Sequence, residues 1–241
     1  MSTGLSFLCV IGFIIIHLFT RHLKFLRRKP RSQFLSIAGG IAVAYVFLHL
    51  LPELGDFQEE LKGEGLLSFF EHHIYMIALF GLVLFYGLEQ FVKTSHKHRT
   101  DASSIEHHAG VFWVHIGTFA LYNFSIGYLL VREEFTGSLG PWAFFVALGV
   151  HFITIDSSLD EQHDKDYEKY GRWLLTASIL LGWATGVVTE IHPFILSYLV
   201  ALLAGGIILN VMKEELPEER ESSYPAFFGG VFGYTVLLLL I

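Results

Sequence analysis

Eight apolar runs of spanning length occupy most of this 241-residue chain and leave no stretch long enough for a separate soluble domain. They cover residues 4–20, 33–51, 66–92, 109–131, 141–159, 173–189, 193–212 and 224–241. The hydrocarbon core of a bilayer is roughly 30 Å thick and needs about 20 apolar residues per helix. The composition agrees with a membrane protein, because 53% of the residues are hydrophobic and only 16% are charged. We therefore expect an all-α integral membrane protein with eight transmembrane helices, in which residues 1–241 form a single transmembrane domain.

Lysine and arginine are distributed unevenly between the loops. If the first run enters from outside, all 16 of these residues except Lys62 and Arg132 lie on the cytoplasmic side. Basic residues accumulate on the side to which the chain is not translocated. Residues 1–20 have no basic stretch before the apolar core and no small-residue cleavage site, which indicates an uncleaved first helix. We predict a protein of the cell membrane with both termini outside.

Composition also limits the chemistry that this chain can perform. Cys9 is the only cysteine, so neither a disulfide nor a thiolate metal cluster can form within one chain. No nucleophile paired with a base and no phosphate-binding glycine loop stands out, so we do not expect an enzyme. The net charge of −7 lies in exposed segments and does not indicate nucleic acid binding. The expected partner is the lipid bilayer, no cofactor is required, and a homodimer is an open alternative to a monomer.

The segment after the second run forms an acidic mouth on the predicted outer face. Against Lys62 it carries five acidic residues: Glu53, Asp56, Glu59, Glu60 and Glu64. Such a patch raises the local concentration of cations. Next to it, Glu71-His72-His73 is a compact candidate for cation binding. A solvated acidic loop and interfacial anchoring of polar side chains are the alternative explanations.

The predicted inner loop between the third and fourth runs is rich in histidine: His96, His98, His107 and His108. Imidazoles grouped in this way can bind zinc, copper or nickel loosely. A flexible polar linker would have the same composition.

An internal echo indicates two related halves. Gly39-Gly40 is followed after a short apolar stretch by Leu51-Pro52-Glu53, and Gly205-Gly206 is followed likewise by Leu216-Pro217-Glu218. In the predicted topology the first copy ends outside and the second ends inside, as in the inverted repeats of many secondary transporters. The same residues also suit close-packing glycines and helix stops, because glycine lets membrane helices approach and proline ends a helix.

The eight spans with both ends outside, the histidine-bearing loop and the Leu-Pro-Glu echoes resemble the ZIP (ZRT/IRT-like) divalent metal transporters. The resemblance covers nearly the whole chain and is most specific over residues 205–218. It implies a 3+2+3 arrangement of helices with an inverted repeat. It also implies a metal site, often with two ions, between the fourth and fifth helices.

The ligand motifs of that family are only partly present in this chain. Its fourth helix reads His-Asn, two residues, an acid and Gly, against Tyr122-Asn123-Phe124-Ser125-Ile126-Gly127 here. Tyr122 therefore stands in the position of the ligand His, and Ile126 in that of the acid. Asn123 and Gly127 match.

The fifth-helix motif is matched to residues 151–156, where only His151 is retained without qualification. Phe152 and Ile155 replace ligands, and Thr154 replaces the helix-bending proline, so this helix should run straighter. The sixth-helix glutamate corresponds to Glu190. Asn123, His151 and Glu190 together offer one carboxylate, which leaves about one charge of a divalent ion uncompensated. We expect the usual site of the family to be lost or much weakened.

Other ionisable residues of the same helices are candidates for a substitute site. A rise of about 1.5 Å per residue places His115, His151 and Asp156 in the inner half of the membrane. His108, His115 and Tyr122 recur every seven residues and so form one stripe. Ionisable residues inside a membrane are rare and costly, which makes functional use the default hypothesis. Hydrogen bonds that join neighbouring helices are the alternative.

From these patterns we expect a ZIP-like transporter of divalent metal cations, zinc or a related ion, that works through a weakened or altered site. A non-transporting relative that serves as a metal sensor or as an interaction scaffold is the competing hypothesis. Proton or small-solute passage through the histidines is a third.

The distribution of basic residues generates a topological prediction. Labels placed in segments 94–104 and 214–222 should be accessible from the cytoplasm, and a label at 56–64 should be accessible from outside. Membrane-impermeant labelling of intact and opened cells measures this. An externally accessible 94–104 segment would contradict the whole assignment.

Overall fold

The structure is a computed structural model that describes residues 3–23, 33–62, 71–97, 104–132, 140–215 and 223–240. Every regular element within these ranges is helical. The elements are α1 (Thr3–Phe19), η1 (Thr20–His22), α2 (Gln33–Tyr45), η3 (Val46–Leu50), α3 (Leu51–Glu60), α4 (His73–Lys97), α5 (Ser104–Arg132), α6 (Gly140–Asp166), η4 (Tyr167–Gly171), α7 (Arg172–Val188), α8 (Pro193–Glu215) and α9 (Tyr224–Leu239). A helix overlaps each of the eight expected apolar runs.

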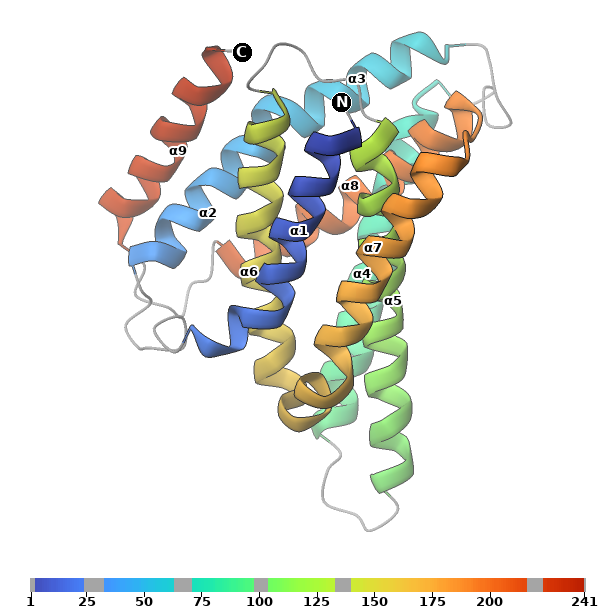
Figure 1. Ribbon diagram of the computed structural model, residues 1–241, viewed down its shortest axis with the longest axis vertical. Coiled ribbons are helices and arrows are strands. Elements are labelled where there is room, and N and C mark those ends of the chain that lie inside the picture. The colour runs from blue at the N-terminus through green and yellow to red at the C-terminus, as the bar shows by residue number, and fades with distance from the viewer. Residues whose placement is uncertain are drawn as a thin grey trace.

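Six segments of the described chain are long and apolar enough to cross a membrane: Thr3–His22, Gln33–Glu60, His73–Val92, Gly110–Arg132, Gly140–Val188 and Pro193–Lys213. The number is lower than eight because η4 joins α6 and α7 into one segment and because α9 has only 16 residues. Near Asp164, whose φ is 37°, the chain reverses direction between α6 and α7 (Figure 1). The predicted all-helical architecture is confirmed, and the long apolar helices agree with an integral membrane protein. Eight spanning helices stay a prediction.

Large apolar side chains are exposed on the outward faces of these helices. On α4, Leu79, Phe80 and Val83 are each more than half exposed, and Leu121 of α5 is similar. Soluble monomers rarely expose contiguous apolar surface of this kind, whereas hydrocarbon accepts it. The exposed apolar surface therefore supports a membrane environment.

Glycines determine which helices pack most closely. A Cβ on Gly40 of α2 would lie 2.2 Å from the carbonyl oxygen of Phe227, and a Cβ on Gly230 of α9 would lie 2.2 Å from that of Ile37. Real Cβ atoms do not approach a backbone this closely. Only glycine permits the two helices to cross at this distance.

The same kind of contact joins α4 to α8. A Cβ on Gly205 would lie 2.0 Å from the carbonyl oxygen of Ala78, and one on Gly81 would lie 2.1 Å from that of Leu202. Gly40 and Gly205 belong to the two copies of the sequence echo. Their close-packing role, one of the two explanations offered by the sequence, is confirmed.

A third glycine contact joins α5 to α7. Cβ atoms on Gly127 and Gly182 would lie 2.2 Å and 1.9 Å from the carbonyl oxygens of Ile179 and Phe124, respectively. In all three pairs, each glycine faces the carbonyl oxygen three residues before the partner's glycine, and Figure 1 shows the paired helices running in the same direction.

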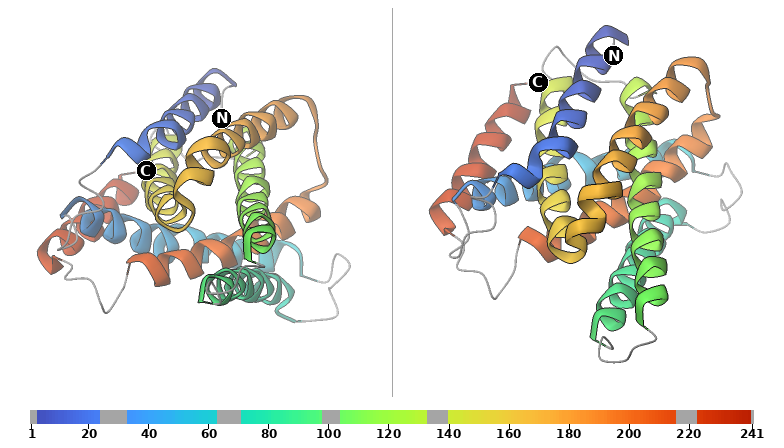
Figure 2. Two further views of the ribbon diagram at one scale, coloured as in Figure 1. Left: turned by 90° about the horizontal axis from the view of Figure 1, so that it is seen from below. Right: turned by 60° about the horizontal axis from the view of Figure 1, so that its bottom comes forward.

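The helices form two groups. One contains α1, α5, α6 and α7, and the other contains α2, α4, α8 and α9, with the most extensive packing inside each group. Figure 2 shows them as two layers, and Figure 1 places the two ends of the chain opposite the turn between α6 and α7. The interface between the two groups is called the seam below.

Proline shapes the end of this seam that lies beside α3. The topology prediction places this end outside, and it is called the outer end below. Pro52 has no N–H and clashes with a preceding carbonyl in a regular helix. The chain accommodates it through the wide π-helical turn η3, in which the Leu51 N–H donates to the Val46 carbonyl oxygen. Such turns are frequent at functional sites.

The glycine contacts generate a stability prediction with a built-in control. Gly230→Ala should destabilise the fold by about 1–3 kcal/mol, because the added methyl group would collide with the α2 backbone. Gly229→Ala should be neutral, since no atom lies within 4 Å of its Cβ position. Thermal unfolding of the purified variants measures both. Equal melting temperatures would contradict the close crossing.

Candidate functional site

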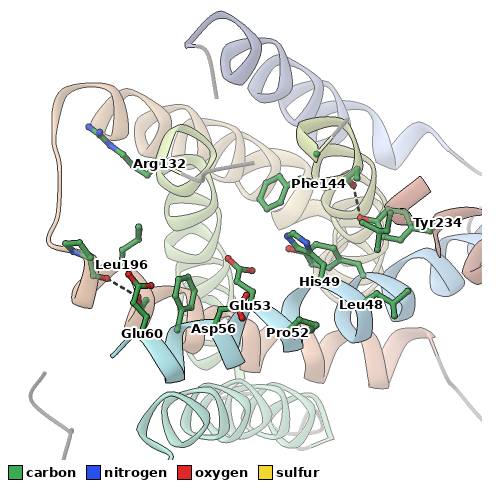
Figure 3. Close-up of a pocket in the computed structure, with 17 residues that line it drawn as sticks. Leu48, His49, Pro52, Glu53, Asp56, Glu60, Arg132, Phe144, Leu196 and Tyr234 are labelled. Atoms are coloured by element: carbon green, nitrogen blue, oxygen red, sulfur yellow. Dashed lines mark hydrogen bonds between the residues drawn. The ribbon is translucent and has the colours of Figure 1, made fainter. Parts of the chain in front are cut away.

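A pocket of about 690 Å³ opens at the outer end of the seam (Figure 3). Residues from both helix groups line it, including Tyr45 and His49 before α3, Phe144 of α6, Leu196 of α8 and Tyr234 of α9. The Tyr234 hydroxyl donates to the Ala143 carbonyl oxygen at 3.0 Å, which ties α9 to α6 beside the pocket.

One wall of the pocket is acidic. Glu53, Asp56 and Glu60 follow one another at spacings of three and four residues, so they share one face of α3 and extend over about 10 Å. Arg132 lies away from them, and its Nη1 donates to Oε1 of Glu190 at 2.7 Å. The arginine charge is therefore balanced locally, and the three carboxylates keep the wall negative.

Two much smaller cavities, of about 30 Å³ and about 10 Å³, continue inward along the seam. Ile126, Leu129, Leu148, Leu203 and Ile207 line the middle cavity, with Glu53 at its outer edge. The inner cavity is lined by Glu89, Phe119, Ile155, Ser158, Leu159, Gln162, Asn210 and Lys213.

The residue numbers of the lining advance in order along three helices. On α8, for example, the lining passes from Leu196 to Leu203 to Lys213, a distance of about 25 Å. The three cavities therefore lie in a row between the two helix groups.

The predicted central site lies between the middle and inner cavities. Tyr122 of α5 and His151 of α6 are both buried, and a hydrogen bond of 3.0 Å joins the Tyr122 hydroxyl to His151 Nε2. Asn123 Nδ2 donates to the Phe119 carbonyl oxygen, and Asn123 Oδ1 has no hydrogen-bond partner. Around Thr154 α6 keeps its helical backbone, as the missing proline predicts.

Glu190 is not part of this centre. Glu190 follows the end of α7, and its side chain is 81% exposed. It pairs there with Arg132, at the outer end of the molecule. Asn123, His151 and Glu190 are therefore not brought together.

The predicted substitute cluster is divided between separate partners. Asp156 is fully buried and pairs with His17 of α1, whose Nδ1 lies 2.9 Å from Oδ2. His115 Nδ1 lies 2.9 Å from His163 Nε2, and His115 Nε2 lies 3.4 Å from Glu89 Oε1. In the part of the chain that the structure describes, no three His, Cys, Asp or Glu side chains form a group that could hold a metal ion. Each candidate has a different environment.

The peripheral candidates are also dispersed where they are described. Glu71 and His72 are exposed, whereas His73 is buried, with its Nδ1 3.3 Å from Gln58 Nε2. The side chains of His96, His107 and His108, together with all of His98, lie outside the described residues.

Sequence reasoning missed three residues of these networks. His17 stands alone as a histidine in the first apolar run, and Glu89 is a carboxylate inside the third, so their position in a membrane span was a usable signal. His163 follows the fifth run and carried no such signal.

Comparisons with known proteins add no assignment. No family model matches the chain, and no curated protein matches it.

The His17–Asp156 pair generates a stability prediction. Asp156→Leu should cost about 3–5 kcal/mol, because removing one member of a buried pair leaves the other without compensation. His17→Leu combined with Asp156→Leu should recover most of this loss. Denaturant unfolding of the single and double variants measures the coupling. Additive losses would show that the two side chains do not stabilise each other.

Proposed function

We propose that this protein is a ZIP-like membrane transporter of divalent metal cations, zinc or a related ion, that works through an altered site. The observation that carries the proposal is the row of three cavities between the helix groups. Carboxylates line its outer end, and a carboxylate and an imidazole lie at its inner end. A negative entrance raises the local concentration of cations.

The helix pairs support the proposed 3+2+3 arrangement with an inverted repeat. In such a repeat α1 corresponds to α7, α2 to α8, α4 to α9 and α5 to α6. The pair α2/α9 then corresponds to the pair α8/α4. Both pairs cross at glycines of the sequence echo. The pair α5/α7 likewise corresponds to α6/α1, in which Gly12 and Gly149 lie against side chains of the partner helix. Leu216-Pro217-Glu218, the second half of the echo, lies outside the described residues.

The chemistry of the seam fits passage through a weakened centre. An apolar middle cavity cannot compensate a bare divalent charge, so an ion must exchange water for ligands there. Asn123 Oδ1 and His151 Nε2 are the ligand atoms nearest to the family pattern. His151 Nε2 becomes free to coordinate when its bond to Tyr122 breaks. We place the acid-lined end outside the cell membrane, with both termini on the same side.

An uptake measurement tests this proposal. In liposomes, the combined change Glu53→Gln, Asp56→Asn and Glu60→Gln should lower the initial rate of zinc uptake about tenfold, because it removes the charge that concentrates the ion. Glu59→Gln is the matched control, since Glu59 is on the same helix but does not line the pocket. Zinc uptake by the triple variant at the parental rate would contradict the proposed entrance.

The competing function is a non-transporting ZIP-like protein that serves as a metal sensor or interaction scaffold. The closed Tyr122–His151 bond favours this alternative, because it occupies a ligand nitrogen at the centre. Zinc that binds to the purified protein without uptake above that of empty liposomes would support it over transport.

A further inference from the structure

The Glu89 carboxylate at the inner end of the seam has a nitrogen beside each oxygen. Lys213 Nζ of α8 lies 2.6 Å from Oε2, and His115 Nε2 of α5 lies 3.4 Å from Oε1. Glu89 is 6% exposed and His115 is fully buried. Burial of a carboxylate is costly, so a positive partner is required at this position.

The cavity beside this carboxylate is polar on several sides. Gln162 of α6 lines it, and the buried amide oxygen of Gln162 has no hydrogen-bond partner. Asn210 of α8 also lines it and is 4% exposed, with an unpartnered amide nitrogen. Buried polar atoms are normally satisfied, so those left without partners indicate a place for a ligand.

The nitrogen and oxygen atoms are spaced as ligands of one metal ion. With bonds of about 2.0–2.1 Å, two ligands of a tetrahedral site lie about 3.3 Å apart. The observed 3.4 Å between His115 Nε2 and Glu89 Oε1 matches this. His115 Nδ1 is held at 2.9 Å by His163 Nε2, and a partner at the second ring nitrogen is what orients metal-bound imidazoles.

We propose that Glu89, His115 and Gln162 form a divalent-cation site at the inner end of the seam, and that the Lys213 ammonium, which pairs with the other oxygen of Glu89, competes with the cation for the carboxylate. An ion binds there when Lys213 leaves the carboxylate, and the returning ammonium expels it. The inference takes its ligand class from the proposed transport function. A lysine that competes for the carboxylate would give the inner end a device for releasing the ion.

The ligand set selects the class of ion. One imidazole, one carboxylate and one amide oxygen suit Mn²⁺, Fe²⁺, Co²⁺ or Zn²⁺ rather than a thiolate-seeking ion. Water would complete the coordination. Because only two strong ligands are present, the site should be weak, as release requires. The imidazole must be neutral to coordinate, so binding should weaken in acid.

Titration of the purified full-length protein with Co²⁺ tests the site, because the visible absorption of cobalt reports its ligands. Lys213→Gln should bind Co²⁺ at least tenfold more tightly than the parent, since a competing positive charge is gone. Lys213→Arg, the matched control, should stay at the parental affinity. Adding Glu89→Gln to Lys213→Gln should abolish the gain. An unchanged affinity in Lys213→Gln, or a gain that survives Glu89→Gln, would overturn the proposal.

Two further measurements keep the result independent of folding and of transport. If Lys213→Gln shows no cooperative thermal unfolding transition, His115→Gln is titrated with Co²⁺ instead. We expect His115→Gln to lose the weak Co²⁺ absorption that the parent shows. A parental signal that persists would count against the site. The variant that neutralises Glu53, Asp56 and Glu60 should keep the inner Co²⁺ signal whatever its uptake rate. Failure of zinc uptake alone would therefore contradict the proposed transport function but not the proposed Glu89 site.

Discussion

Glycine contacts between backbones determine where this molecule can have an interior route. At Gly40, Gly230, Gly81 and Gly205, one helix lies so close to the next that a methyl group would collide with a carbonyl oxygen. Helix pairs joined in this way have no room for a cavity between them. The space that remains lies where the two groups face each other, and all three described cavities are found there. Close packing within the groups and open space between them are two consequences of one constraint.

The charges along the seam follow the demands of a low-dielectric interior. Carboxylates occur near the wide outer pocket, where water can solvate them, and again at Glu89, where Lys213 and His115 compensate the charge. Between these ends the lining of the middle cavity is apolar apart from Tyr45 and Glu53, and the buried Tyr122, Asn123 and His151 follow toward the inner cavity along α5 and α6. A divalent ion would therefore find anionic ligands at both ends and neutral ligands at the centre. Such a distribution suits brief occupancy better than storage.

The helices and their glycine contacts were predictable because both depend on local sequence. Apolar runs of about 20 residues predict the helices, and Gly-Gly pairs inside them predict close crossings. The acidic mouth was also predictable in part, since Glu53, Asp56 and Glu60 recur at helical spacing. That they line a large pocket was not predictable, because the opposite wall comes from α6, α8 and α9.

The partners of the buried ionisable residues depend on contacts that no local pattern encodes. Asp156 and His17 are separated by 139 positions in sequence, and Glu89 and Lys213 by 124. Depth estimates placed His115, His151 and Asp156 at neighbouring levels of the membrane but not on facing surfaces. Glu190 is the opposite case. Its sequence position matches a ligand motif, but its side chain is exposed and pairs with Arg132.

Accessibility of single cysteines along the seam tests the central claim most directly, namely that an aqueous route approaches the centre from both sides between the two helix groups. In a Cys9→Ser background, Glu53→Cys should react with a membrane-impermeant thiol reagent added outside, and Gln162→Cys with the same reagent added inside. Leu203→Cys in the apolar middle should react from neither side, nor should Leu121→Cys, which is exposed on α5 away from the cavities. Protection of both Glu53→Cys and Gln162→Cys from either side would contradict the account.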